Sequence, residues 1–173
     1  MPAPTPLQLL QPVLTLNPGT YCSTILATGS VTLNPGVYVF DGADLILPIA
    51  ATLAGNGVTL VFTSSNGAYY GTLAALGVVS LNLSPMTTGP TAGIAIWLDL
   101  AGTRPLAFVT ALSVLNVTGA IYAPASPVNI IGVSATPCAQ IVAWQISILG
   151  ATTLRHNCTG LGTADVIAYK LLE

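Results

Sequence analysis

The pentapeptide NPGTY at residues 17–21 returns as NPGVY at residues 34–38, and each copy follows a short apolar run. Asn-Pro-Gly favours a turn, because proline fixes its own φ and glycine reaches the positive φ values that many tight turns need. The same turn repeated at a short interval predicts a chain that bends at equivalent corners of successive structural repeats. This repetition constrains the fold more than any other feature of the sequence.

Short strands fill the intervals between such corners. Alternation of apolar and polar residues divides the chain into groups of three strands separated by Gly, Pro or Asn. Equivalent strands are placed at Ile25, Leu45, Leu73, Leu106, Val128 and Ile146. A period of about 20 residues with three short strands is typical of a parallel β-helix, in which each coil buries its apolar side against the next. The 13 Pro and 17 Gly residues would interrupt a helix at almost every candidate site.

We therefore predict an all-β fold, a parallel β-helix (solenoid) of about six coils with three short strands in each coil. Residues 15–160 would form this domain. Residues 1–14 would be an N-terminal cap or leader segment, and residues 161–173 a C-terminal cap or tail. A chain of 173 residues is long enough to form one domain with its own core.

Charged side chains make up only 5% of the chain, whereas an ordinary domain carries roughly 25%. Binding to nucleic acid requires clustered Lys and Arg, so we exclude nucleic acid as a partner. Although 53% of the residues are hydrophobic, turn residues interrupt every stretch before it reaches the roughly 20 apolar residues of a transmembrane helix. We expect no transmembrane segment. The N-terminal residues also lack the basic and long apolar regions of a signal peptide.

A set of motifs carries a family resemblance. NPGTYC, NPGVYVFDGADL, GNGVTLVFTSSNG, GPTAGIAIW, LNVTGAIYAP and TPCAQIVA follow one another, and RHNC comes later. In this order they resemble the C-terminal region of bacterial TadG-like proteins of the Flp pilus-assembly family. The resemblance covers roughly residues 15–160. It implies a right-handed β-helix on the exported side of a bacterial envelope, extracellular or exposed at the cell envelope, with no known enzymatic activity and no catalytic residues to carry over.

Strand alternation also predicts which side chains face outward. Where the resemblance leads us to expect Thr, Ser and Asn, the outward column before the turns is mostly apolar. One apolar residue per coil, at a coil spacing of about 4.8 Å, would build a continuous ridge, and exposed ridges of this kind often mark interfaces. The predicted interface comprises Leu26, Ile46, Pro48, Leu76, Val78, Val109, Ile131, Val133 and Leu149.

Two other interpretations of this ridge stay open. A loop or a terminal segment could cover it, or a register shifted by one residue would place the same side chains in the core. Its apolar character also fits a redesigned surface, which would explain the low charge.

Candidate catalytic groups are few. Asp41 and Asp44 are the only closely spaced carboxylates, and in DGAD they are more typical of turn residues that bond local backbone than of a catalytic pair. His156 is the only histidine, and no orienting group accompanies it in the sequence. We therefore expect that this protein is not an enzyme.

The cysteines indicate structure rather than chemistry. Cys138 and Cys158 are about one coil apart, which predicts a disulfide between stacked positions. Cys22 would then be a free, buried thiol. No CxxC or paired-histidine spacing indicates zinc, so we expect neither a metal nor a cofactor.

The leading hypothesis is a non-enzymatic structural or interaction solenoid. Its flat apolar face would bind a second copy of the chain, a protein partner or a surface, so a homo-oligomer is one expected form. An ice-binding protein with a flat solenoid face is the first alternative, although the candidate face lacks repeated Thr ladders. A polysaccharide-active β-helix enzyme is the second alternative, and the missing acidic cluster disfavours it.

Overall fold

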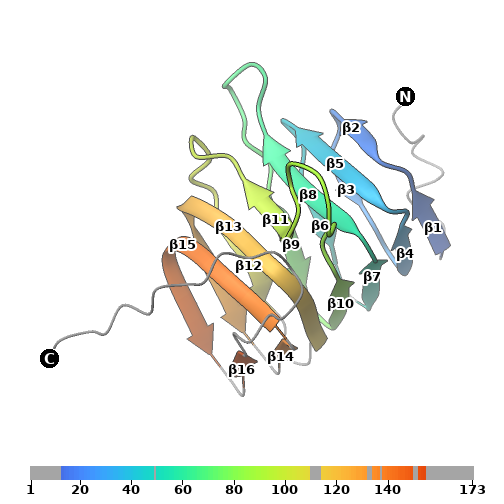
Figure 1. Cartoon of the computed structure of the whole chain (residues 1–173), viewed down its shortest axis with the longest axis vertical. Coiled ribbons are helices and arrows are strands. Elements are labelled where there is room, and N and C mark those ends of the chain that lie inside the picture. The colour runs from blue at the N-terminus through green and yellow to red at the C-terminus, as the bar shows by residue number, and fades with distance from the viewer. Residues whose placement is uncertain are drawn as a thin grey trace, which may run out of the picture.

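Figure 1 shows the computed structural model of the chain, which describes residues 13–48, 50–109, 114–131, 134–136, 138–149 and 152–154. Within these ranges every regular element is a β-strand. All strand pairings are parallel, and the sheets curl around a common core. The prediction of an all-β, solenoid-like fold is confirmed. None of the described residues belongs to a helix long and apolar enough to cross a membrane.

Three ladders of parallel strands run side by side along the molecule. Ladder A contains β1 (Val13–Leu16), β4 (Ser30–Leu33), β7 (Ala51–Gly55), β10 (Val79–Leu83) and the first part of β13 (Val114–Ile131). Ladder B contains β2 (Gly19–Tyr21), β5 (Gly36–Asp41), β8 (Val58–Thr63), β11 (Ile94–Leu98), the middle of β13 and the first part of β15 (Cys138–Leu149). Ladder C contains β3 (Ile25–Leu26), β6 (Leu45–Leu47), β9 (Leu73–Leu76), β12 (Leu106–Val109) and the last parts of β13 and β15.

A coil is one passage of the chain through ladders A, B and C. Two further strands, β14 (Ser134–Thr136) and β16 (Thr152–Leu154), pair with each other in a separate parallel sheet. The first ladder begins at Val13. The predicted caps at residues 1–14 and 161–173 otherwise lie outside the described residues and stay predictions.

The core consists of inward side chains that repeat in register from coil to coil. In ladder A, Leu53, Leu81 and Leu115 are successive register partners, and each is at most 2% exposed. In ladder C, Leu45 and Leu73 pair in the same way and are fully buried. Because side chains alternate along a strand, every second residue enters this core and its neighbours face outward. Burial of apolar surface in these columns is the main driving force for stacking the coils.

The repeated NPG turns lie at the corner between ladders A and B. Gly36 has a φ of +139°, and a Cβ atom there would lie 2.5 Å from Cγ of Pro18, so only glycine lets the second turn stack on the first. The side-chain amide of Asn34 donates a hydrogen bond from its Nδ2 to Oδ1 of Asn17 at 2.8 Å. Tyr38 closes the turn from the inside, because its hydroxyl lies 2.7 Å from the carbonyl oxygen of Asn34 and 2.8 Å from that of Leu16.

Candidate functional site

Two outward columns cross ladder C and contain most of the predicted interface. Leu26 is in register with Ile46 in the first column, and Ile46 continues it to Ala74. Leu76 begins the second column, whose further members through β12, β13 and β15 are Val109, Ile131 and Leu149. Residues two apart in a strand share a face, so the two columns are neighbours on one surface. We call these seven residues the apolar face.

Side chains of the apolar face that the structure describes reach the surface. Leu26, Leu76 and Leu149 are 45%, 44% and 59% exposed, whereas Ile46 and Ile131 are partly buried. The side-chain exposure therefore does not fit the interpretation that a shifted register buries them. Val109 is placed by its backbone pairing alone.

The other three predicted interface residues lie outside the two columns. Pro48 is partly buried and Val78 is exposed, and both lie just outside the strands. Val133 lies outside the described residues. Towards the C-terminal end, the first column continues as Asn129 and Ser147, so the apolar character there is carried by the second column alone.

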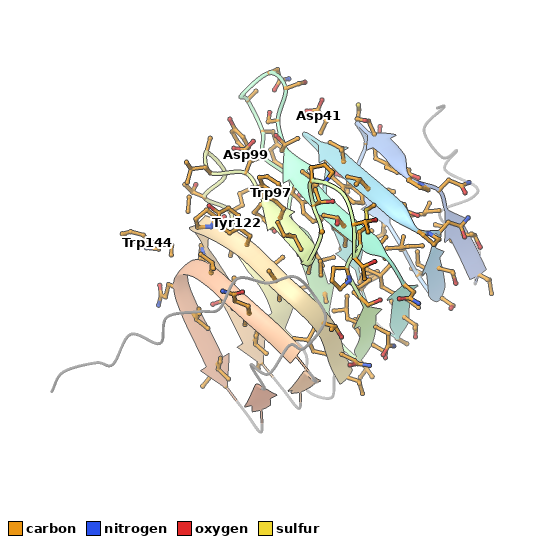
Figure 2. The ribbon with its side chains drawn as sticks, in the orientation of Figure 1. Asp41, Trp97, Asp99, Tyr122 and Trp144 are labelled. Carbon is orange, nitrogen blue, oxygen red and sulfur yellow. The ribbon has the colours of Figure 1, made fainter. Side chains whose placement is uncertain are left out.

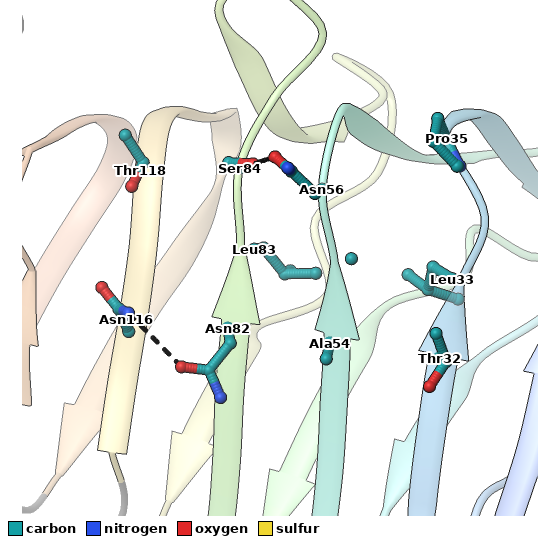
Figure 3. Close-up of a pocket in the computed structure, with 11 residues that line it drawn as sticks. Thr32, Leu33, Pro35, Ala54, Asn56, Asn82, Leu83, Ser84, Asn116 and Thr118 are labelled. Atoms are coloured by element: carbon teal, nitrogen blue, oxygen red, sulfur yellow. Dashed lines mark hydrogen bonds between the residues drawn. The ribbon is translucent and has the colours of Figure 1, made fainter.

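The outward surface of ladder A is polar and was missed by sequence reasoning. Thr32 is in register with Ala54, and Ala54 with Asn82, which accepts a 3.3 Å hydrogen bond from the amide of Asn116. These columns border an open groove of about 470 Å³, shown in Figure 3. Polar side chains that line it come from four successive coils: Thr32, Asn56, Asn82, Ser84, Asn116 and Thr118. The alternation of polar and apolar residues in SVTL and VSLNL was the sequence signal that could have predicted these outward polar columns.

The outward surface of ladder B carries aromatic side chains. Trp97 and Tyr122 are register partners whose rings meet edge to face, with centroids 6.0 Å apart. Figure 2 shows them beside each other and Trp144 projecting away from the neighbouring strand. The outward surfaces of the coils therefore differ in chemistry: ladder A is mostly polar, ladder C is mostly aliphatic, and ladder B carries aromatic rings at β11 and β13 in a column that is otherwise valine from β5 to β15.

The two carboxylates of DGAD bind loops rather than each other. Asp41 accepts a 2.6 Å hydrogen bond from the backbone N–H of Ser65, which lowers the pKa of this carboxyl. Asp44 is buried and accepts from the backbone N–H of Thr72 at 2.9 Å. The prediction that both residues bond local backbone is thus wrong, because their partners are 24 and 28 residues further along the chain.

Asp44 is also the centre of a side-chain cluster. Its Oδ1 lies 2.6 Å from Nη1 of Arg104, and its Oδ2 accepts a 2.6 Å hydrogen bond from the hydroxyl of Tyr69. The Arg104 guanidinium lies over the Tyr69 ring, 4.6 Å from its centroid. The hydrogen bond to Asp44 raises the pKa of Tyr69. Both oxygens of Asp44 are therefore occupied by structural partners, which leaves this carboxylate poorly placed to serve as a general acid or base.

The cysteines give one correction. Cys22 is free, as predicted, but it is exposed rather than buried. The reason is its position between β2 and β3, where Cys22, Ser23 and Thr24 are all exposed. Cys138 begins β15 opposite Thr118, but Cys158 and His156 lie outside the described residues, so the predicted disulfide stays a prediction. Among the described residues, no three His, Cys, Asp or Glu side chains gather to form a candidate metal site.

Comparisons with protein families, with curated proteins and with solved structures find no match to this chain. The resemblance to TadG-like proteins therefore stays a prediction.

Proposed function

We propose that this protein is a non-enzymatic interaction module, a right-handed parallel β-helix of about six coils whose apolar face binds a second copy of the chain. The observation that carries the proposal is the unbroken register of Leu76, Val109, Ile131 and Leu149 along ladder C. Single exposed leucines are common on protein surfaces. A column of aliphatic residues on successive coils, with Leu76 and Leu149 exposed, forms a contiguous patch, and such patches usually mark interaction sites.

The chemistry of the apolar face favours a second copy over a charged partner. Neither column contains a charged residue, and interface cores are depleted of charge in the same way. A two-fold pairing sets the same surface patch against itself, so an uncharged aliphatic face meets no electrostatic conflict. The resemblance to TadG-like proteins supports a location on the exported side of a bacterial envelope.

The test is the molar mass in solution, measured by light scattering over a concentration series. We expect the mass to rise from the monomer value of 17.5 kDa towards twice that value. The double variant Leu26→Thr/Leu76→Thr should stay monomeric, because it removes the exposed aliphatic side chains of two coils. Leu100→Thr is the matched control, since Leu100 is exposed in the loop after β11 and lies outside the apolar face. A native chain that stays monomeric throughout would contradict the proposal.

One observation favours ice binding as a second candidate function. Ladder A places Thr15 opposite Thr32, and it places Thr52 opposite Ser30 and Ser80. Hydroxyl groups thus repeat on a parallel sheet at the strand spacing of about 4.8 Å. We would expect thermal hysteresis that is lost in Thr32→Leu/Thr52→Leu. Absence of hysteresis in the native chain at high concentration would remove this candidate.

A further inference from the structure

The groove along ladder A runs across successive coils. Its lining residues belong to β4, β7, β10 and β13, or to the turns that directly follow the first three of these strands. Neighbouring strands of a sheet are about 4.8 Å apart, so a groove over four strands extends for roughly 14 Å along the solenoid. Its volume of about 470 Å³ is ordinary for a ligand site, since such sites measure roughly 300–1,000 Å³. The groove therefore has room for a short segment of a chain molecule.

The middle of the groove is low because β7 carries small residues there. Ala54 and Gly55 line the groove at the end of β7, and their register partners in β4 and β10 all have larger side chains. Leu33 and Leu83, the two partners of Gly55, add apolar surface to the lining, and Pro35 adds more from the turn after β4. The hollow over β7 thus has apolar sides.

Polar groups of both kinds border this hollow. Nδ2 of Asn116 donates to Oδ1 of Asn82, whose own Nδ2 donates to Oγ of Ser80 at 3.2 Å. The hydroxyl of Ser84 donates to Oδ1 of Asn56, as Figure 3 also shows. These bonds leave Oδ1 of Asn116 and Nδ2 of Asn56 without a partner among the described residues. The groove therefore offers a ligand both an acceptor and a donor.

The chemistry of the lining selects the class of ligand. None of the lining residues is charged, so no group in the groove would attract a charged ligand. Hydroxyl groups both donate and accept hydrogen bonds, and sugar rings also carry apolar C–H surface. An extended peptide fits less well, because β4, β7 and β10 each pair on both sides and have no open edge to which a peptide strand could add.

We propose that this groove binds a linear, uncharged glycan that lies along the solenoid across β4, β7, β10 and β13. The sugar hydroxyls would bond to the Asn, Ser and Thr side chains of successive coils, and the sugar rings would pack over the hollow at Ala54. This binding is separate from pairing through the apolar face, because it uses ladder A and leaves ladder C free.

The test is a nuclear magnetic resonance titration of the full chain with cellotetraose, an extended and uncharged chain of four sugar rings. We expect the side-chain amide signals of Asn82 and Asn116 to shift in a saturable way, with a Kd of about 1 mM. Ala54→Leu fills the hollow and should weaken binding about tenfold or more. Asn116→Ala removes one acceptor and should weaken it by up to about tenfold, the effect of one hydrogen bond. Thr20→Leu is the matched control, because it adds the same side chain at an exposed position of β2 outside the groove, and it should leave the Kd unchanged.

Three results would overturn the proposal. In the first, the native chain shows no saturable shift at about ten times the expected Kd. In the second, a folded Ala54→Leu variant, checked by circular dichroism, binds as tightly as the native chain; if this variant does not fold, Asn116→Ala takes its place. In the third, an uncharged octapeptide of serine and glycine binds more tightly than cellotetraose, which would assign the groove to a protein partner. The same titration of Leu26→Thr/Leu76→Thr separates a failure of glycan binding from a failure of pairing through the apolar face.

Discussion

The two loop-bearing corners of the coil are held in different ways. At the corner between ladders A and B, two NPG turns stack directly, with the ring of Pro18 against the backbone of Gly36 and the side chain of Asn34 on Asn17. At the corner between ladders B and C, loops follow β8 and β11, and Asp44 joins both by binding Thr72 and Arg104. The first corner is held by close backbone shape between adjacent coils. The second is held by polar groups up to 60 residues apart.

This difference predicts which substitutions would destabilise each corner. A stacked turn has no room for an added atom, and damage to it disturbs only the contact between two neighbouring coils. A shared carboxylate links three coils, so its loss releases two loops at once. Thr72 extends the link, because its hydroxyl donates a 2.8 Å hydrogen bond to the carbonyl oxygen of Pro105.

The largest effect should come from Gly71→Ala at the corner between ladders B and C. A Cβ atom at this buried glycine would lie 1.8 Å from the backbone oxygen of Ala43. Backbone cannot rotate away as a side chain can, so we expect a loss of at least about 4 kcal/mol or failure to fold. Urea unfolding followed by circular dichroism measures this. An unchanged midpoint would show that the loops are not tightly packed here.

Gly36→Ala should have the next largest effect, at the corner between ladders A and B. The new methyl group would overlap the Pro18 ring and occupy a φ of +139°, so we expect a loss of about 2–4 kcal/mol. Gly89→Ala is the matched control, because Gly89 has a φ of +92° with no atom within 4 Å of the added Cβ. Gly89→Ala therefore measures the cost of the positive φ without a steric clash. Equal unfolding midpoints for the two variants would contradict close stacking of the turns.

Asp44→Asn should have a moderate effect. The amide cannot accept from Thr72, Tyr69 and Arg104 together, because one of its two polar atoms is a donor. We expect a loss of about 1–3 kcal/mol, typical of hydrogen bonds to a charged group. The ion pair itself adds little, since the Arg104 side chain is 41% exposed. Asp41→Asn is the control on the exposed side of the same corner, and a loss as large as that of Asp44→Asn would argue against a central role for Asp44.

The smallest effect should be a decline in stability at alkaline pH. Burial raises the pKa of Tyr38 to about 12, whereas an unfolded tyrosine titrates near 10.0. From pH 10 to about 12 the unfolded chain loses this proton and the folded chain keeps it, so the contribution present below pH 10 is progressively lost. Tyr38→Phe should flatten this decline in urea unfolding measured across the same range. The raised pKa values of Tyr21 and Tyr69 leave a remaining slope of the same sign.

The features that follow from local rules could be predicted from the sequence. The repeated NPG turns and the period-two alternation indicate the strand positions. They also place Leu26 and Leu76 outward, because successive side chains of a strand point to opposite faces of the sheet. The cluster around Asp44 could not be predicted, because its partners stand 25, 28 and 60 residues away and only the stacked coils bring them together. The polar groove of ladder A was missed for another reason. Asn82 and Asn116 look like ordinary solvated residues until their strands are aligned.

The parallel ladders have a mechanical consequence. Their hydrogen bonds run along the long direction of the solenoid, from β1 to β15, and within the described strands the ladder bonds of each coil join it only to the coils before and after it. A pulling force applied between the two ends would therefore load one row of bonds at a time and peel coils away from the ends inward. A force applied across the axis would shear many rows together and meet far greater resistance. A chain built in this way is weak under axial tension and stiff against lateral load.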